Sequence, residues 1–173
     1  GTLTAQSKNI LEAKIFIRKD GVIIISANIE ETEKTIAGGL EIWKNLKQDL
    51  SNIFEGHENL PNLLAQRTRY ISEKRTTVAI TPKVKVDNAS DPNFSIVRIE
   101  ARDHLGMLYK ISKVFSDLDI RIHSAKVSTQ GGRGIDVFYV SHQNKKILFE
   151  KLARSTKEKT ISAMMVKNPE ELG

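Results

Sequence analysis

The chain of 173 residues contains no cysteine. Disulfides and zinc sites built on thiolates are therefore excluded, and the absence fits a reducing compartment, so we expect a cytoplasmic protein. No apolar run approaches the eighteen or so residues that a membrane span requires. The first ten residues lack the charged and then apolar pattern of a secretion signal. With 39% hydrophobic residues to build a core, the chain is predicted to be globular, with no membrane partner.

The sequence also lacks the common signatures of catalysis. It contains no GxxxxGK[ST] phosphate loop, no GxGxxG, no HExxH and no GxSxG. The histidines show no ligand spacing, so no metal site and no cofactor are predicted; they are His57, His104, His123 and His142. We therefore expect no catalysis within this chain.

Positive charge is only modestly in excess over negative charge. The net charge of +6 is compatible with nucleic acid or an anionic surface as a partner. However, 21 acidic residues are mixed with the basic ones, and even the densest basic run, 67–75, contains Glu73. We interpret this run as a solvated helix face and linker, because basic surface alone does not specify a ligand.

The residues between Phe94 and Val140 show the clearest structural pattern. Apolar residues on both faces of Phe94–Ala101 predict a strand in the middle of a sheet. Helical spacings of three, four and seven follow from Gly106 and predict an amphipathic helix of about three turns. Two β-branched and aromatic runs come next, joined by Gln130–Gly132, which favours a hairpin. The predicted order is strand, helix, strand, strand.

A shift of the sequence by 112 positions reveals an internal repeat. The shift aligns Ile10 with Ile122, Ala13 with Ala125, Lys14 with Lys126 and Ile23 with Ile135. The first hairpin would turn at Lys19–Gly21. No counterpart of the strand Phe94–Ala101 precedes it, so the first unit is expected to start part-way through a domain. Such a unit would have an unpaired sheet edge and an uncovered apolar face.

Between the repeats the pattern is helical. An apolar stripe predicts a helix from Leu40 to Ile53 that stops at Gly56, and Asn59 is a plausible N-cap of a short helix from Leu60 to Ile71. The strand Thr76–Val86 would complete the first unit. We therefore assign residues 1–86, with a helical connector at about 40–71, to the first unit. Residues 87–93 are a polar linker, and residues 94–173 form the second unit.

The second unit is expected to end with a helix near Leu152 and a short run, Thr160–Val166. This run fits a closing strand or a helical tail, and we favour the strand. Both units are then βαββαβ, which predicts an α+β, ferredoxin-like fold whose helices cover one face of an antiparallel sheet.

The same order occurs in RNA-recognition domains. Their third strand carries an R-G-[FY]-[GA]-F-V-x-[FY] pattern whose aromatic rings stack on bases. Here RGIDVFYV matches only the first two residues, since Ile135, Val137 and Val140 occupy the stacking positions and Asp136 adds negative charge. RNA binding remains a minor alternative, and nucleic acid is not the expected partner.

The turn Ala101–Leu108 is the best candidate for a ligand site. Asp103 and polar neighbours meet Gly106 at the start of a helix, where free amides and the helix dipole favour a carboxylate or another small anion. A glycine also lets a ligand approach the backbone. Alternatively, Asp103 only caps the helix and Gly106 only permits a tight turn; spacing alone does not separate these interpretations.

The segment RDHLGMLYKIS resembles the ACT domain family, whose turn is close to D-R-P-G-L-L. The longer run from DNASDPNFSIVRIEA to DVFYV, with TPKVKVDN and LPNLLAQR before it, resembles the C-terminal tandem ACT region of the PII-protein uridylyltransferase/uridylyl-removing family. The resemblance covers nearly the whole chain. Three residues depart from the usual pattern: Leu105 replaces a proline, His104 an arginine and Arg121 an asparagine.

The resemblance implies an amino-acid sensor, with glutamine as the favoured effector. In that family one catalytic domain uridylylates the PII signal protein, another removes the group, and the ACT pair reports glutamine to both; neither catalytic domain is in these residues. ACT units pair through sheet edges or helix faces, so ACT pairing or a homodimer is implied, and a ligand-independent pairing module is the first alternative. The implied ligand-binding residues are Asp103, His104, Gly106, Met107, Leu108, Arg121 and Asn9.

Overall fold

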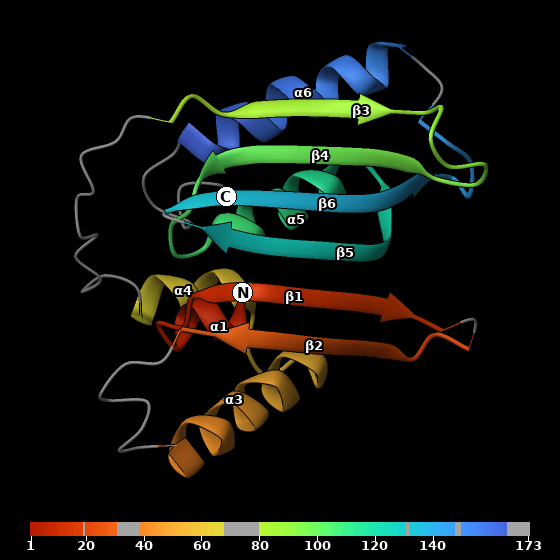
Figure 1. Cartoon of the computed structure of the whole chain (residues 1–173). Helices are drawn as coiled ribbons and strands as arrows, with labels where there is room; N and C mark the ends of the chain where they lie inside the picture. The colour runs from red at the N-terminus through yellow and green to blue at the C-terminus, as the bar shows by residue number, and fades with distance from the viewer. Residues whose placement is uncertain (19, 31–38, 68–79, 131, 148–149, 166–173) are drawn as a thin grey trace.

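The computed structural model describes residues 1–18, 20–30, 39–67, 80–130, 132–147 and 150–165. In chain order its elements are α1 (Thr2–Ala5), β1 (Ile10–Ile17), β2 (Ile23–Ile29), α3 (Gly39–Phe54), α4 (Leu60–Arg67), β3 (Lys83–Asp87), β4 (Ser95–Arg102), α5 (Met107–Asp117), β5 (Ile120–Gln130), β6 (Arg133–His142) and α6 (Glu150–Met165). The strands form one antiparallel sheet in the order β2-β1-β5-β6-β4-β3, with α5 and α6 on the same face (Figure 1). The expected α+β class is confirmed. Among the described residues, no helix combines the length and apolar character needed to cross a membrane.

The second unit has the predicted order of elements. β4, α5, β5 and β6 follow one another as strand, helix, strand and strand. β4 lies between β6 and β3, as expected for a strand with apolar residues on both faces. The prediction for residues 94–140 is therefore confirmed.

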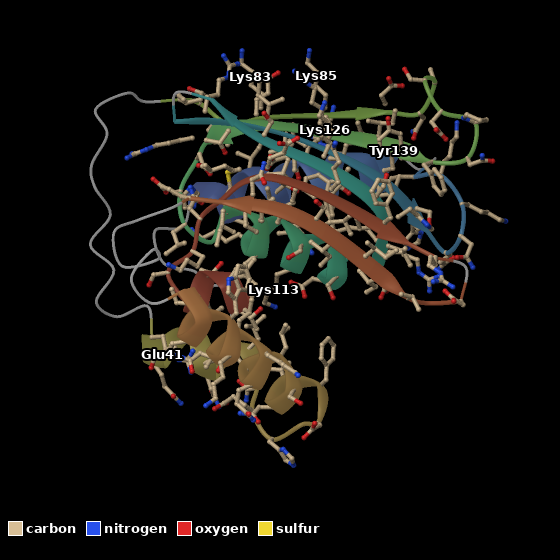
Figure 2. The ribbon with its side chains drawn as sticks, turned by 60° about the horizontal axis from the view of Figure 1, so that its bottom comes forward. Glu41, Lys83, Lys85, Lys113, Lys126 and Tyr139 are labelled. Atoms are coloured by element: carbon tan, nitrogen blue, oxygen red, sulfur yellow. The ribbon has the colours of Figure 1, made fainter. Side chains whose placement is uncertain are left out.

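The face of the sheet away from the helices is open and basic. Figure 2 shows Lys83, Lys85, Lys126 and Tyr139 on this side. Lys126 lies directly opposite Lys14, and Lys85 directly opposite Arg98, so like charges are neighbours across two strand pairs. Glu100 shares this face, since it lies directly opposite Lys83.

The residues compared with the RNA-binding pattern divide between the two faces. Ile135 and Val137 are half-buried and alternate along β6 with buried Asp136 and Val140. Val140 belongs to the core cluster under the helices. The expectation that Val140 stands at a stacking position, and that Asp136 adds charge to that surface, is therefore wrong, because the period of two turns both residues inward.

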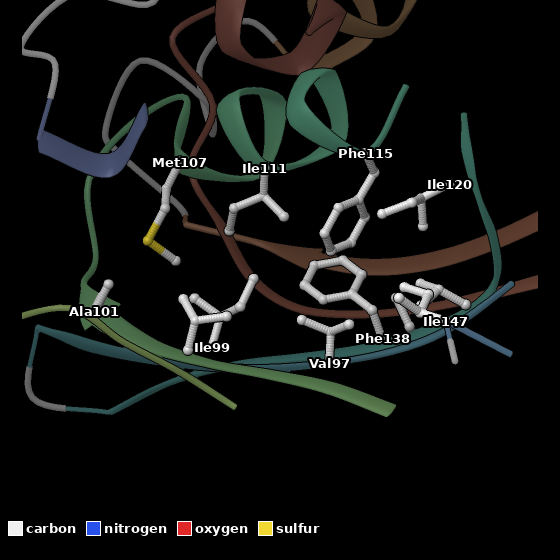
Figure 3. Packing of buried hydrophobic residues seen from close by; sticks show 12 residues of the cluster. Val97, Ile99, Ala101, Met107, Ile111, Phe115, Ile120, Phe138 and Ile147 are labelled. Carbon is white, nitrogen blue, oxygen red and sulfur yellow. The ribbon is translucent and has the colours of Figure 1, made fainter. Parts of the chain in front are cut away.

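The core of the second unit is the contact between α5 and the sheet. Figure 3 shows α5 side chains pointing at apolar side chains of the strands. The rings of Phe115 and Phe138 meet edge to face, with centroids 5.2 Å apart and an interplanar angle of 90°, an arrangement that aromatic pairs favour. The most buried members of this cluster are Val97, Ile99, Ala101, Ile111, Phe115, Val140 and Ile147.

The strand expected to complete the first unit instead belongs to the second. β3 pairs with β4, from Lys83 opposite Glu100 to Asp87 opposite Ile96. Val84 is buried in the core of the second unit, so this pairing covers the otherwise free edge of β4 and buries apolar surface. The boundary after residue 86 is wrong in this respect; residues 76–79 of the expected strand lie outside the described part of the chain.

The closing strand expected at Thr160–Val166 is also wrong. α6 runs through this region to Met165, and Val166 lies outside the described residues. Its buried positions, Thr156, Thr160 and Ala163, are spaced by four and three residues, which is the period of a helix. The place of a fourth strand beside β4 is already taken by β3.

The connector is helical where it is described. α3 ends at Phe54, and Gly56 has a left-handed φ of 76°, as a helix stop requires. The Asn62 N–H donates to Asn59 Oδ1 at 2.8 Å, so Asn59 caps α4 as predicted. α4 ends at Arg67, and the remainder of the helix expected to reach Ile71 lies outside the described residues.

The first unit repeats only the second part of the second unit. β1, β2 and α3 follow the order of β5, β6 and α6, and both α3 and α6 are 16 residues long. β2 is the last strand on its side of the sheet, and Ile23 and Ile25 are 58% and 62% exposed. Within the described part of the chain, no further strand pairs with β2 and these isoleucines are exposed, as expected from the repeat.

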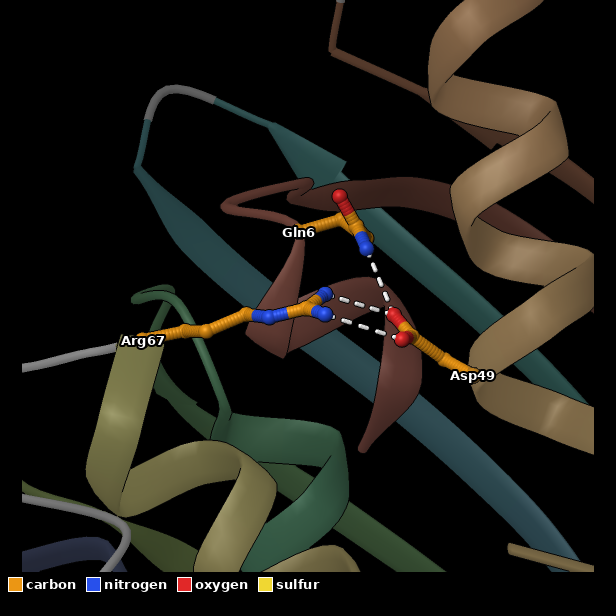
Figure 4. Close-up of polar contacts among 3 residues, drawn as sticks. All are labelled: Gln6, Asp49 and Arg67. Carbon is orange, nitrogen blue, oxygen red and sulfur yellow. Dashed lines mark hydrogen bonds and ion pairs between the residues drawn. The ribbon is translucent and has the colours of Figure 1, made fainter. Parts of the chain in front are cut away.

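A buried carboxylate ties α1, α3 and α4 together (Figure 4). Asp49 on α3 accepts two hydrogen bonds from the Arg67 guanidinium, at 2.6 and 2.9 Å, and one from the Gln6 amide at 2.5 Å. The Asp49 side chain is 6% exposed and that of Arg67 38%. The bidentate geometry orients the connector helices against the segment that precedes β1.

We expect Asp49→Asn to destabilise the chain by about 1–2 kcal/mol, because it removes the charge of a buried, bidentate acceptor. Chemical denaturation measures the change. The control is Glu158→Gln, which weakens the exposed pair with Arg154 and should change stability by less than about 0.5 kcal/mol. Equal effects of the two substitutions would contradict a structural role for the Asp49 cluster.

Candidate functional site

The loop between β4 and α5 forms one wall of a small recess. Gly106 starts α5 with a φ of 85°, and no side chain caps the helix. The carbonyl of His104 accepts a hydrogen bond from the Met107 N–H at 3.1 Å, and the Asp103 N–H donates to Gly132 O at 2.9 Å. The loop is thus fixed by its backbone, while the Asp103 side chain does not serve as the helix cap.

The other wall comes from the first unit. The Asn9 side-chain amide donates a hydrogen bond to Asp103 Oδ2 at 2.9 Å, across 94 positions of sequence. Pairing of β1 with β5, with Ala13 opposite Val127, brings these segments together. The recess between the walls has a volume of about 20 Å³ and is lined by Thr4, Lys8, Asn9, Ile10, Asp103, His104, Gly106, Met107, Leu108 and Val127.

A chain of polar contacts runs behind the loop. His104 Nδ1 lies 3.1 Å from Arg102 O, and His104 Nε2 lies 3.2 Å from Lys110 Nζ. Because a carbonyl accepts and an ammonium donates, these contacts fit a neutral ring that carries its proton on Nδ1. Lys110 is fully buried, so its contact with His104 is shielded from solvent.

Comparison with known proteins agrees with this architecture. Residues 83–167 match the family model described as "ACR9-like, ACT-like domain". The chain is also 29% identical, over 140 residues, to the bifunctional uridylyltransferase/uridylyl-removing enzyme of Rhodospirillum rubrum. That match covers 81% of this chain and 15% of the relative, so the chain corresponds to a small part of the relative's length. Residues 83–167 are therefore an ACT-like domain. No solved structure matches it.

The matched range 83–167 begins at β3, in agreement with the pairing of β3 with β4. The ACT-like unit therefore includes the strand that the sequence pattern assigned to the first unit. It also ends beyond α6, without a closing strand in the described residues. The ferredoxin-like sheet is completed at this edge by a strand from before β4.

Most of the residues expected at the ACT ligand site lie together. Six of the seven line the recess, and the exception is Arg121. Arg121 is exposed at the start of β5, opposite Ser141, whereas Val127, which lines the recess, is six residues further along the strand. The repeat aligns Arg121 with Asn9, but β1 and β5 are antiparallel, so the two strand starts lie at opposite ends of the pairing. The structure thus does not bring Arg121 to this recess.

Other lining residues were not predicted, namely Thr4, Lys8, Ile10 and Val127. Thr4 and Lys8 are 6% and 7% exposed, although nothing in the local sequence distinguishes them. They reach the recess only because β1 adds to the edge of β5. An antiparallel pairing of the two repeats, assumed in advance, would have placed the α1–β1 turn beside the loop.

Asp136 is the least satisfied polar group near this site. It is fully buried, and neither carboxylate oxygen has a well-formed hydrogen bond with a described residue. Burial raises its pKa to about 7, and the Asp103 carboxylate adds to the rise, while the backbone N–H of Ser128 opposes it. Asp136 lies directly opposite Val127, next to the wall of the recess.

The histidines are not gathered at one site. His123 contacts Ser141 Oγ at 2.8 Å and packs on Phe94, with ring centroids 4.4 Å apart. Burial, and next the charge of Arg121, lower the pKa of His123. No group of three or more metal-ligating side chains was found in the described part of the chain.

Proposed function

We propose that this chain is an amino-acid-sensing regulatory region, with glutamine as its effector, and that it controls the addition and removal of uridylyl groups on the PII signal protein. The relative's name supports the link to uridylyl transfer, and the ACT-like family supports a regulatory role. The catalytic steps would belong to other domains of the same polypeptide. Within this chain the proposal concerns ligand binding and its consequences.

The single observation that carries the proposal is the Asn9–Asp103 hydrogen bond beside the start of α5. An amino acid in the recess would present its carboxylate to the first-turn amides of α5, where the helix dipole favours negative charge. Its ammonium group would pair with the Asp103 carboxylate. Asn9 and Asp103 satisfy each other here, so a ligand would replace an existing contact.

This arrangement suggests how binding reaches the rest of the protein. Asn9 belongs to the first unit and Asp103 to the second, so a ligand between them changes the contact between units. The volume of about 20 Å³ holds little more than one water, so a whole amino acid requires the walls to separate. Binding would shift the population towards the more open arrangement, by as much as its affinities for the two arrangements differ.

The test is titration calorimetry of the chain with glutamine, combined with thermal unfolding. A saturable heat and a rise in Tm are expected, since a ligand that binds only the folded state stabilises it. Gly106→Asn should abolish both effects, because its side chain would enter the recess. Asparagine tolerates the left-handed φ of 85° better than a β-branched residue such as valine, for which strain would add unfolding to the loss of binding.

The control is Gly56→Asn, at a glycine with a φ of 76° and no atom within 4 Å of an added Cβ. This variant should bind glutamine as the parent chain does. No heat and no change in Tm at millimolar glutamine would count against the proposal. Unchanged binding by Gly106→Asn would show that the loop takes no part.

A ligand-independent pairing module is the second candidate. The edge-to-edge pairing of β1 with β5, from Glu12 opposite Ser128 to Phe16 opposite Ser124, is the observation that favours it. Sedimentation at several protein concentrations separates the two candidates. Concentration-dependent association without any response to amino acids would support the pairing module.

A further inference from the structure

Asp136 lies beside the recess, as the register partner of Val127. Its register partners are Ile99 on β4 and Val127 on β5, so its side chain stands between apolar neighbours on the helix side of the sheet. Val127 itself lines the recess. Side chains of direct partners are about 5 Å apart at their Cβ atoms, so Asp136 is a direct neighbour of a residue that lines the recess.

Among the described residues, the charge recorded as acting on the Asp136 carboxylate is that of Asp103, which has the same sign. A buried polar group without a partner is rare and calls for a specific explanation, and an ionised carboxylate in an apolar site is costly. Both oxygens lack a well-formed hydrogen bond among the described residues. A neutral carboxylic acid is therefore favoured while the recess is empty of cations.

The charged and titratable groups at the recess and next to its lining come from three segments. The loop contributes Asp103 and His104, α5 contributes Lys110, and the α1–β1 turn contributes Lys8. Lys110 Nζ contacts the ring of His104. Asp103 is the group whose charge acts on Asp136 and raises its pKa. Because charges inside a protein are poorly screened, a cation placed at Asp103 would act on Asp136 with the opposite sign.

We propose that Asp136 is a second, proton-linked carboxylate of the recess, which loses its proton when the ammonium group of an amino acid binds at Asp103. The O–H bond of the carboxylic acid breaks, the proton goes to the buffer, and the carboxylate remains to balance the ammonium charge. This inference rests on the proposed amino-acid site. It gives that site a preference for ligands with an ammonium group and an affinity that rises with pH.

The expected size of the pH effect follows from the linkage between ligand binding and proton release. If the ammonium group favours ionised Asp136 by about tenfold, affinity should rise about fivefold between pH 6 and pH 8. About 0.4 proton should be released per ligand at pH 7. Asp136→Asn should bind with the same affinity at both pH values, close to that of the parent chain at pH 6, and should release no proton.

The experiment is calorimetric titration with glutamine at pH 6, 7 and 8, in two buffers with different enthalpies of ionisation. The parent chain is compared with Asp136→Asn and with His104→Gln, because protonation of His104 would also weaken binding of an ammonium group at low pH. Asp119→Asn is the control, since Asp119 is exposed and its φ of 54° is tolerated by asparagine.

Loss of the pH dependence in Asp136→Asn alone would support the inference. Binding that is independent of pH in the parent chain would overturn it, while the proposed amino-acid site would stand. A pH dependence that persists in Asp136→Asn but disappears in His104→Gln would also overturn it. Loss of glutamine binding by Asp136→Asn at pH 6 as well as pH 8 would contradict a purely proton-linked role. No binding by the parent chain at any pH would instead remove the proposed function itself.

Discussion

Asp136→Asn is expected to make the chain more stable at pH 8 and to change its stability little below pH 4. The pKa of Asp136 is raised from 3.8 to about 7 in the folded chain, so between these values the folded state binds more protons than the unfolded state. The stability of the parent chain therefore falls as pH rises through this window. Asparagine cannot ionise, so the variant avoids that loss.

The upper limit of the gain is about 4 kcal/mol, since each pKa unit corresponds to about 1.4 kcal/mol. The buried amide still lacks partners, which reduces the gain. Urea denaturation of both proteins at intervals from pH 4 to pH 8 measures it. Asp119→Asn, at an exposed position, should follow the parent curve. Parallel curves for Asp136→Asn and the parent chain would contradict an ionised, unpaired Asp136.

The period-two pattern already contained the position of Asp136. Along β6 it alternates with the half-buried Ile135 and Val137 and falls in phase with Phe138, a core residue. When one face of a strand packs on a core, the alternation determines the face on which each side chain lies. The aromatic RNA-binding pattern would assign Asp136 to the exposed surface, whereas the alternation along β6 predicts that its carboxylate is buried.

The local elements of the second unit could be predicted because they depend on short-range patterns. The apolar period of residues 94–118 and the glycines after Gln130 determine strand, helix and hairpin. The position of β3 in the sheet depends on the strand with which it pairs, since the pattern of Lys83–Asp87 fits an added strand in either unit. Its pairing with β4 is decided by which edge is free and which core Val84 can enter. No local pattern contains that information.

The candidate site was predictable on one wall only. The loop from Asp103 to Leu108 follows from a strand, a glycine and a helix start in sequence. The opposite wall, with Lys8 and Asn9, depends on the antiparallel pairing of the two repeats. That pairing also explains Arg121, because equivalent positions of two antiparallel units lie at opposite ends of their shared edge. The repeat shows that Asn9 and Arg121 are equivalent positions. It does not show whether the two units pair in parallel or antiparallel.

Phe115→Ala is expected to be the most destabilising substitution considered. Phe115 is fully buried, and its ring packs edge to face on Phe138 in the centre of the contact between α5 and the sheet (Figure 3). Removing a buried aromatic ring costs about 3–5 kcal/mol, through lost burial and the cavity that remains. Chemical denaturation should show this loss. The control is Phe54→Ala, at a ring that is 84% exposed, which should change stability by less than about 0.5 kcal/mol.

The same substitution tests whether the packing of α5 holds the recess together. Phe115 lies about two and a half turns after Gly106, on the helix whose first residues line the recess. If α5 positions the loop, the folded fraction of Phe115→Ala should bind glutamine more weakly than the parent chain, because the loop must be ordered as the ligand binds. Calorimetry at a temperature well below the Tm of the variant measures this effect. A large loss of stability with unchanged affinity would mean that the contacts of the loop with Gly132 and Asn9 fix the recess without help from the helix.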